Sequence, residues 1–130
     1  STINTAVTKV SMSFGDAFLK GVFCNFLVCL AVWLAFAAKS AAGKIIALFY
    51  PIMVFVVCGF EHSIANMFYC PAGLFAMGNP DYLALATADV SKLTWGSFLV
   101  NNLIPVTLGN IVGGALLVGL VYWFVYLKKD

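Results

Sequence analysis

Residues 45–77 read IIALFYPIMVFVVCGFEHSIANMFYCPAGLFAM, and this stretch decides the fold. It is too long for one ordinary membrane span of about 20 residues. The sequence CGFEHS (58–63) interrupts it, and a proline lies on either side of that interruption. Because proline breaks the helical hydrogen-bond ladder and glycine lets the chain turn, we predict two half-helices, over 45–58 and 63–77, that meet near the membrane centre.

The interruption carries two adjacent ionisable residues, Glu61 and His62. Such side chains inside a membrane usually face a bundle interior or a wet cavity. Interrupted helices are tolerated where they line a cavity, and a helix N-terminus near Ser63 favours anions. A neutral His62 can bind or exchange a proton with a small weak acid. Glu61 fits a functional role or a structural Glu–His or Glu–Asn hydrogen bond that pins the interruption.

Composition places the whole chain in lipid. Of its 130 residues 63% are apolar and only 9% are charged, and the mean hydropathy is +1.02, whereas about a quarter of the residues in soluble domains are charged. The length suits about three crossings, so we predict an all-α integral membrane protein. The chain contains no arginine and has a net charge of only +2, which argues against a nucleic-acid partner.

Two further apolar stretches flank the interrupted one. We predict a pre-helix segment over 1–16, a membrane helix over 17–38, a polar loop over 78–97 and a last helix over 98–127. The last helix contains a GxxxG spacing that begins at Gly109, and such spacing permits close helix contact.

The lysines predict the orientation of the spans. Four lysines lie on one side of the predicted membrane, and they are Lys39, Lys44, Lys128 and Lys129. The loop on the opposite side carries only Lys92. By the positive-inside rule the C-terminus is cytoplasmic. We therefore predict a multi-pass protein of the cell inner (plasma) membrane.

Other residues are candidates by spacing alone. Asn66 lies four residues after His62 and shares its helix face if the helix begins by residue 62. Asn25 and Asn110, in the flanking helices, fit interhelical hydrogen bonds as well as they fit a ligand role. Phe55, two turns before His62, fits a gate, although core packing explains one phenylalanine among twelve equally simply.

Metal, cofactor and enzyme functions find little support. The four cysteines lie in apolar stretches without a CxxC pair, and the chain has a single histidine, so we expect no metal and no cofactor. A membrane enzyme that uses Glu61 as an acid or base lacks a nucleophile with an adjacent base. We predict that the chain is not an enzyme.

Three motifs carry a resemblance to a known family. GFEHSIANM (59–67), NFLVCLAVW (25–33) and NLIPVTLGNIVGG (102–114) resemble the formate/nitrite transporter family, in order and in spacing. The resemblance implies six membrane helices in two inverted repeats of three, with broken second and fifth helices, an aquaporin-like fold and a homopentamer with one pore per protomer. The chain resembles the second repeat. We expect a fragment, or a first repeat supplied by another chain.

The resemblance also assigns residues. His62 corresponds to the central pore histidine, Phe55 to the constriction phenylalanine, and Lys9 to the lysine thought to draw anions toward the pore. The polar residues that surround the histidine or brace the broken helix correspond to Asn25, Glu61, Asn66 and Asn110.

The implied function is a transmembrane channel for small monovalent anions, with proton-linked passage past His62. Formate is the first expectation, and nitrite, hydrosulfide, acetate and lactate are the others. The proton comes either from His62 or from water in the vestibule. The alternative is a non-conducting membrane scaffold or assembly subunit, which would show no anion flux even beside a first-repeat partner.

Overall fold

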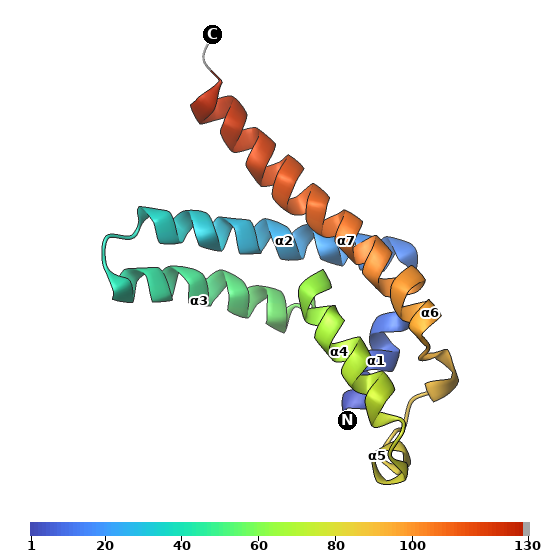
Figure 1. The fold of residues 1–130 in the computed structure, drawn as a ribbon. Helices are drawn as coiled ribbons and strands as arrows, with labels where there is room; N and C mark the ends of the chain where they lie inside the picture. The colour runs from blue at the N-terminus through green and yellow to red at the C-terminus, as the bar shows by residue number, and fades with distance from the viewer. Residues whose placement is uncertain (129–130) are drawn as a thin grey trace.

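The computed structural model describes residues 1–128, and its regular elements there are all helices (Figure 1). Lys129, used above for the orientation, lies outside the described residues. The elements are α1 (Thr2–Val10), α2 (Phe14–Ala37), α3 (Ala41–Val57), α4 (Ser63–Ala76), α5 (Pro80–Ala84), η1 (Val90–Lys92), α6 (Trp95–Ser97), η2 (Phe98–Leu103), α7 (Ile104–Ile111), η3 (Val112–Leu120) and η4 (Trp123–Leu127).

Elements from α6 onward form one helix of 33 residues that ends at Leu127. The stretches η2, η3 and η4 have π-helical bonding within it. Its start lies at Trp95, three residues before the predicted 98. Thr94 and Ser97 explain the earlier start, because each side chain bonds the backbone N–H of the other in a capping box.

α2 crosses this long helix at close range (Figure 1). Glycines line the crossing: a Cβ on Gly113 would collide with the Val22 carbonyl oxygen, and one on Gly109 with that of Phe18. Small residues therefore let the two backbones approach directly, as they do in membrane helix pairs. The GxxxG spacing noted in the sequence lies in this contact.

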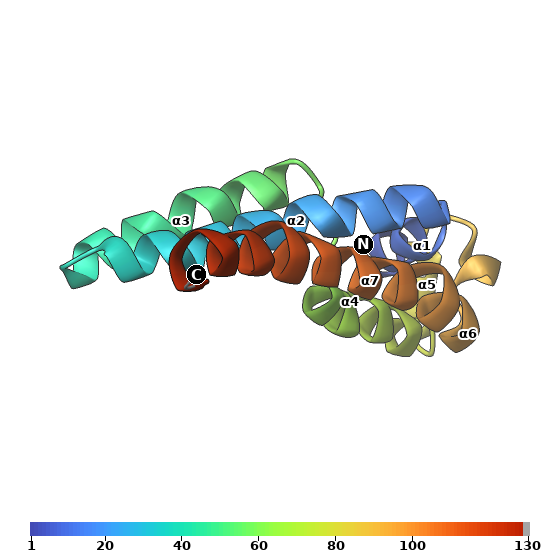
Figure 2. The same cartoon turned by 90° about the horizontal axis from the view of Figure 1, so that it is seen from above.

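α2 and α3 form an antiparallel pair joined by a short turn (Figures 1 and 2). The Ser40 side chain accepts the Gly43 N–H and so caps α3, which begins at Ala41 rather than at 45. α2 corresponds to the predicted helix over 17–38 and begins three residues earlier, where Ser13 caps it.

α1 lies within residues 1–16, for which the sequence predicts a pre-helix segment. Its buried side chains follow a helical spacing, and they are Ile3, Ala6, Val7 and Val10. This face packs against α4 and the buried Cys70. Ser1 accepts the Asn4 N–H and caps the helix.

α3 ends at Val57, one residue before the predicted end at 58, and α4 begins at Ser63, as predicted. We call residues 58–62 the junction. Gly59 has φ +64° there, a left-handed conformation that glycine adopts without steric cost. The chain therefore turns at Gly59, and α4 leaves in a new direction (Figure 1).

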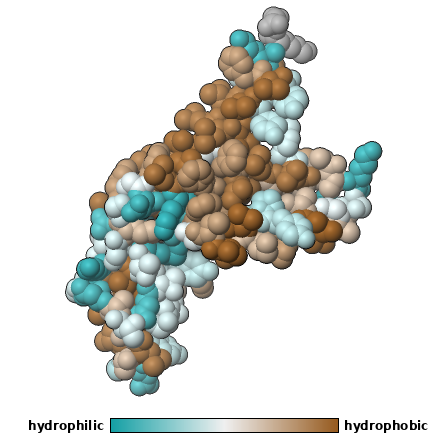
Figure 3. Space-filling view, turned by 180° about the vertical axis from the view of Figure 1, so that it is seen from behind, coloured by the Kyte–Doolittle hydropathy of each residue, from teal (hydrophilic) through white to brown (hydrophobic). Residues whose placement is uncertain are grey.

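Two helices, Phe14–Ala37 and the one over 95–127, are long and apolar enough to cross a membrane. α3 is apolar but shorter. In Figure 3, apolar residues cover the long last helix, while hydrophilic residues gather toward the end that carries α1 and α5. The outer surface of the long last helix is therefore apolar, and the end of the molecule that carries α1 and α5 is more polar.

Candidate functional site

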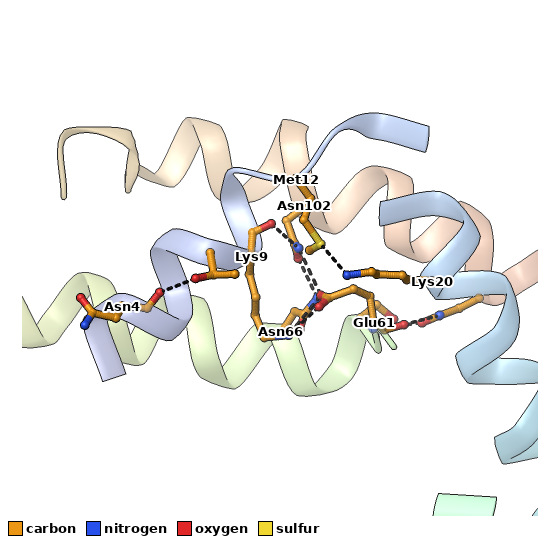
Figure 4. A network of polar contacts seen from close by, with 10 residues as sticks. Asn4, Lys9, Met12, Lys20, Glu61, Asn66 and Asn102 are labelled. Carbon is orange, nitrogen blue, oxygen red and sulfur yellow. Dashed lines mark hydrogen bonds and ion pairs between the residues drawn. The ribbon is translucent and has the colours of Figure 1, made fainter. Parts of the chain in front are cut away.

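A largely buried ion pair joins α1 to the junction (Figure 4). The Lys9 Nζ lies 2.9 Å from Glu61 Oε1 and 3.1 Å from Oε2. The two side chains are only 14% and 6% exposed. Because a buried charge is costly unless it is paired, Lys9 and Glu61 depend on each other. The structure places Lys9 against Glu61, not free at a surface.

Two buried amides complete the cluster around Glu61. Asn66 Nδ2 donates to Glu61 Oε2 at 2.6 Å and to Asn102 Oδ1 at 2.8 Å. Asn102 Nδ2 donates to the Lys9 carbonyl oxygen at 3.0 Å. These bonds tie α1, α4 and the last helix to the junction. The structural alternative for Glu61, a Glu–Asn hydrogen bond, is therefore present.

Asn110 braces the junction from the other side. Its Nδ2 donates to the carbonyl oxygens of Gly21 and Glu61, at 2.8 and 3.0 Å, and its Oδ1 accepts the Ser63 N–H at 2.9 Å. Asn25 Nδ2 donates to the Asn110 carbonyl oxygen at 2.7 Å. The Ser63 N–H, at the start of α4, is thus used by Asn110. Asn25 and Asn110 act as the interhelical partners that the sequence allowed.

His62 and Phe55 form a separate aromatic pair next to this cluster. Their rings stack with centroids 6.2 Å apart and planes 29° from parallel. The imidazole is partly exposed and makes no side-chain hydrogen bond with the residues that the structure describes. Its ring nitrogens therefore keep their capacity to donate and to accept.

The structure brings the seven predicted residues together in three groups. They are the Lys9–Glu61–Asn66 cluster, the Asn25–Asn110 brace and the Phe55–His62 stack. Asn102 was not among the candidate residues predicted from the sequence. Its signal was an asparagine eight residues before Asn110 within an apolar helix, a spacing that places both amides on one helix face.

The described residues offer no assembled metal site. Within 1–128, no three His, Cys, Asp or Glu side chains form a group suited to a metal ion. The cysteines are unpaired thiols, and Cys24 and Cys70 are fully buried in the helix packing. The chemistry available at the junction is thus a partly exposed imidazole beside a buried, neutralised ion pair.

Comparison with known proteins matches the whole arrangement to one family. A family model described as formate/nitrite transporter matches residues 1–124. A probable formate transporter of Methanothermobacter thermautotrophicus is 50% identical over 95% of this chain and 39% of its own length. The formate channel FocA of Escherichia coli strain K12 is 43% identical over 98% of this chain and 47% of its own length.

A solved structure shares the fold. A pentameric formate channel with formate bound has a TM-score of 0.84 and 45% identity, over 98% of this chain and 52% of that one. The chain thus spans about half the length of the proteins that it matches. These relatives are named channels or transporters rather than enzymes. The chain belongs to the formate/nitrite transporter family of membrane transport proteins.

Proposed function

We propose that this chain forms part of a transmembrane channel for small monovalent anions. Formate is the first candidate, because relatives of 43–50% identity are named for it, and nitrite, hydrosulfide, acetate and lactate are the others. The chain would supply the second of two inverted repeats, with α3 and α4 as its broken helix. A first-repeat half, in the same or another chain, would complete the pore.

The observation that carries this proposal is that the residues which brace the junction are different from the one that is available to meet an anion, His62. The ion pair and the amides hold the chain in place, so His62 is not needed as a brace. Its imidazole lies beside the apolar ring of Phe55, 6.2 Å away. An anion that passes this ring loses its hydration, which is costly. A proton supplied at or before His62 would neutralise the anion and lower that cost.

Lys9, Asn25, Asn66 and Asn110 would serve this pathway mainly by positioning. Lys9 remains a candidate for drawing anions in. The proton comes either from His62 or from vestibule water, and replacement of His62 distinguishes the two. We also propose a homopentamer in the inner (plasma) membrane with a cytoplasmic C-terminus. The pentameric relative and the lysines on one side of the spans support this assembly and orientation.

The test uses the complete protein in liposomes. Uptake of formate and of the other four anions is measured with an imposed pH gradient, together with proton movement. We expect formate flux that rises as the external pH falls, because the protonated form crosses most easily. A protein that assembles fully but moves none of these anions would instead be the scaffold alternative.

His62→Phe then tests the histidine in the same assay. We expect loss of the proton-linked component, because phenylalanine neither donates nor accepts a proton. Lys92→Met, in the exposed segment between α5 and α6, is the matched control and should leave flux unchanged. Unchanged formate flux with unchanged proton coupling in His62→Phe would remove the donor role.

A further inference from the structure

Lys20 is a charged side chain inside the apolar helix α2. It lies six residues after Phe14, the first residue of the helix, or about 9 Å along the axis at 1.5 Å per residue. It is partly buried. A lysine within a membrane span is costly unless it faces water, a counter-charge or a functional pathway. The position of Lys20 therefore needs an explanation.

Lys20 lies where α2 meets the junction. Its carbonyl oxygen accepts the Glu61 N–H at 3.3 Å. One turn further along α2, Phe23 stacks on Phe60 with ring centroids 5.7 Å apart. Residues three apart share a helix face, so the face of α2 that carries Lys20 and Phe23 runs along residues 60 and 61. Figure 4 shows the Lys20 side chain extending from α2 with its nitrogen directed at Met12.

Among the residues that the structure describes, Lys20, unlike Lys9, forms no ion pair. Its Nζ contacts the Met12 Sδ at 3.8 Å, and a thioether sulfur is a weak acceptor for a group with three donors. Asp16, one turn earlier, accepts a hydrogen bond from Ser13 Oγ at 2.7 Å. Among the described residues, the ion pair at the junction is that of Lys9 with Glu61.

We infer that the Lys20 ammonium is a second anion-recruiting group, which holds a small monovalent anion where α2 meets the junction. This inference rests on the proposed function. An ammonium with free donors forms charge-assisted hydrogen bonds to a carboxylate or a similar anion, and a positive site raises the local anion concentration. A lysine that only extends its stem toward the interface would have no effect on anion passage.

The test measures initial formate flux of the complete protein in liposomes at low and at high ionic strength. Lys20→Met removes the charge and keeps an unbranched side chain, and Lys20→Arg keeps the charge. We expect Lys20→Met to lower flux roughly three- to tenfold at low ionic strength. It should also flatten the dependence on salt, because screening acts on the removed charge. Lys20→Arg should retain most of the flux.

Lys92→Met is again the control, because it removes an exposed lysine outside the spanning helices and should match the unmodified protein. If Lys20→Met does not assemble, Lys20→Gln replaces it with the same expected result. Wild-type flux and salt dependence in the neutral variant would overturn the inference, as would equal losses in the Met and Arg variants. Absence of formate flux in the unmodified protein would instead contradict the proposed function.

Discussion

The two helices on either side of the junction differ in how this chain covers them. α4 has four buried residues and packs against α1, whereas α3 has none and packs against α2. The outer face of α3 is an apolar surface that the described residues leave uncovered, and it consists of Ile45, Leu48, Phe49, Ile52, Met53, Val56 and Val57. The chain therefore anchors α4 by itself and leaves α3 to lipid or to another segment.

The difference extends to chemistry. The α4 side of the junction holds the polar cluster of Lys9, Glu61, Asn66 and Asn102, and the α3 side carries the Phe55–His62 stack. Among the described residues, the hydrogen bonds of this polar cluster do not involve the imidazole of His62. Substitutions on the two sides should therefore separate stability from transport.

The largest effect should follow from Lys9→Met. It leaves the Glu61 carboxylate buried without its cation, and breaking a buried pair in this way costs about 3 to 5 kcal/mol. Thermal unfolding of the complete protein in lipid or detergent measures the loss. The double variant Lys9→Met/Glu61→Gln should lose less than the two single variants together, because they share one interaction. Strictly additive losses would show that the pair does not brace α4.

Gly73→Ala should come next, because it forces α1 away from α4. An added Cβ would collide with the Ala6 Cβ and lie 3.3 Å from Leu93 Cδ2. Overpacking of this kind costs about 1 to 3 kcal/mol, measurable in the same unfolding assay. Gly15→Ala is the matched control, since a Cβ there meets nothing within 4 Å. Equal stabilities for the two variants would contradict tight packing of α4.

A matched pair of valines compares the two regions directly. Val10 is 3% exposed in the face that α1 presents to α4, and Val56 is 63% exposed on α3. Val10→Ala should cost about 1 to 2 kcal/mol, and Val56→Ala no more than about 0.5 kcal/mol. Unfolding midpoints of the complete protein check both. An equal cost would show that another segment covers α3 and would remove the contrast.

The smallest effect should come from the polar segment beyond α4. Hydrogen bonds from the Ser91 side chain and then from its backbone N–H lower the pKa of the Asp89 carboxyl. Because the folded state favours the carboxylate, the stabilisation is present above the ordinary aspartate pKa and is lost as the pH falls through the lowered one. Ser91→Ala should weaken this acid dependence of the unfolding midpoint slightly. An unchanged pH profile would contradict the role of Ser91.

The sequence predicted the elements better than their contacts. Gly59 and the charged pair after it placed the interruption within one residue of the observed ends of α3 and α4. α1 was missed, because four small or branched apolar residues among threonines resemble a polar leader. The predicted helix starts at 45 and 98 were set by the beginning of each apolar run. The helices begin earlier, at 41 and 95, because their capping residues Ser40 and Thr94 lie ahead of those runs.

At the candidate site, too, the residues were easier to predict from the sequence than their contacts. His62 and Glu61 became candidates because ionisable residues stand out in an apolar stretch. The pairing of Lys9 with Glu61, 52 residues away in sequence, depends on α1 folding onto α4, which no local pattern reveals. Asn102 and Lys20 were overlooked for a related reason: each lies within an apolar run that a span prediction absorbs.

The most direct test of the account asks whether the junction borders water. His62→Cys is placed in a complete protein whose four native cysteines are replaced and whose fold is verified, and a small hydrophilic thiol reagent is applied with and without formate. We predict modification at position 62, slowed by formate, and none at Asn66→Cys in the buried cluster. A thiol at position 62 that stays unreactive in an assembled protein would contradict a water-filled anion passage beside the junction.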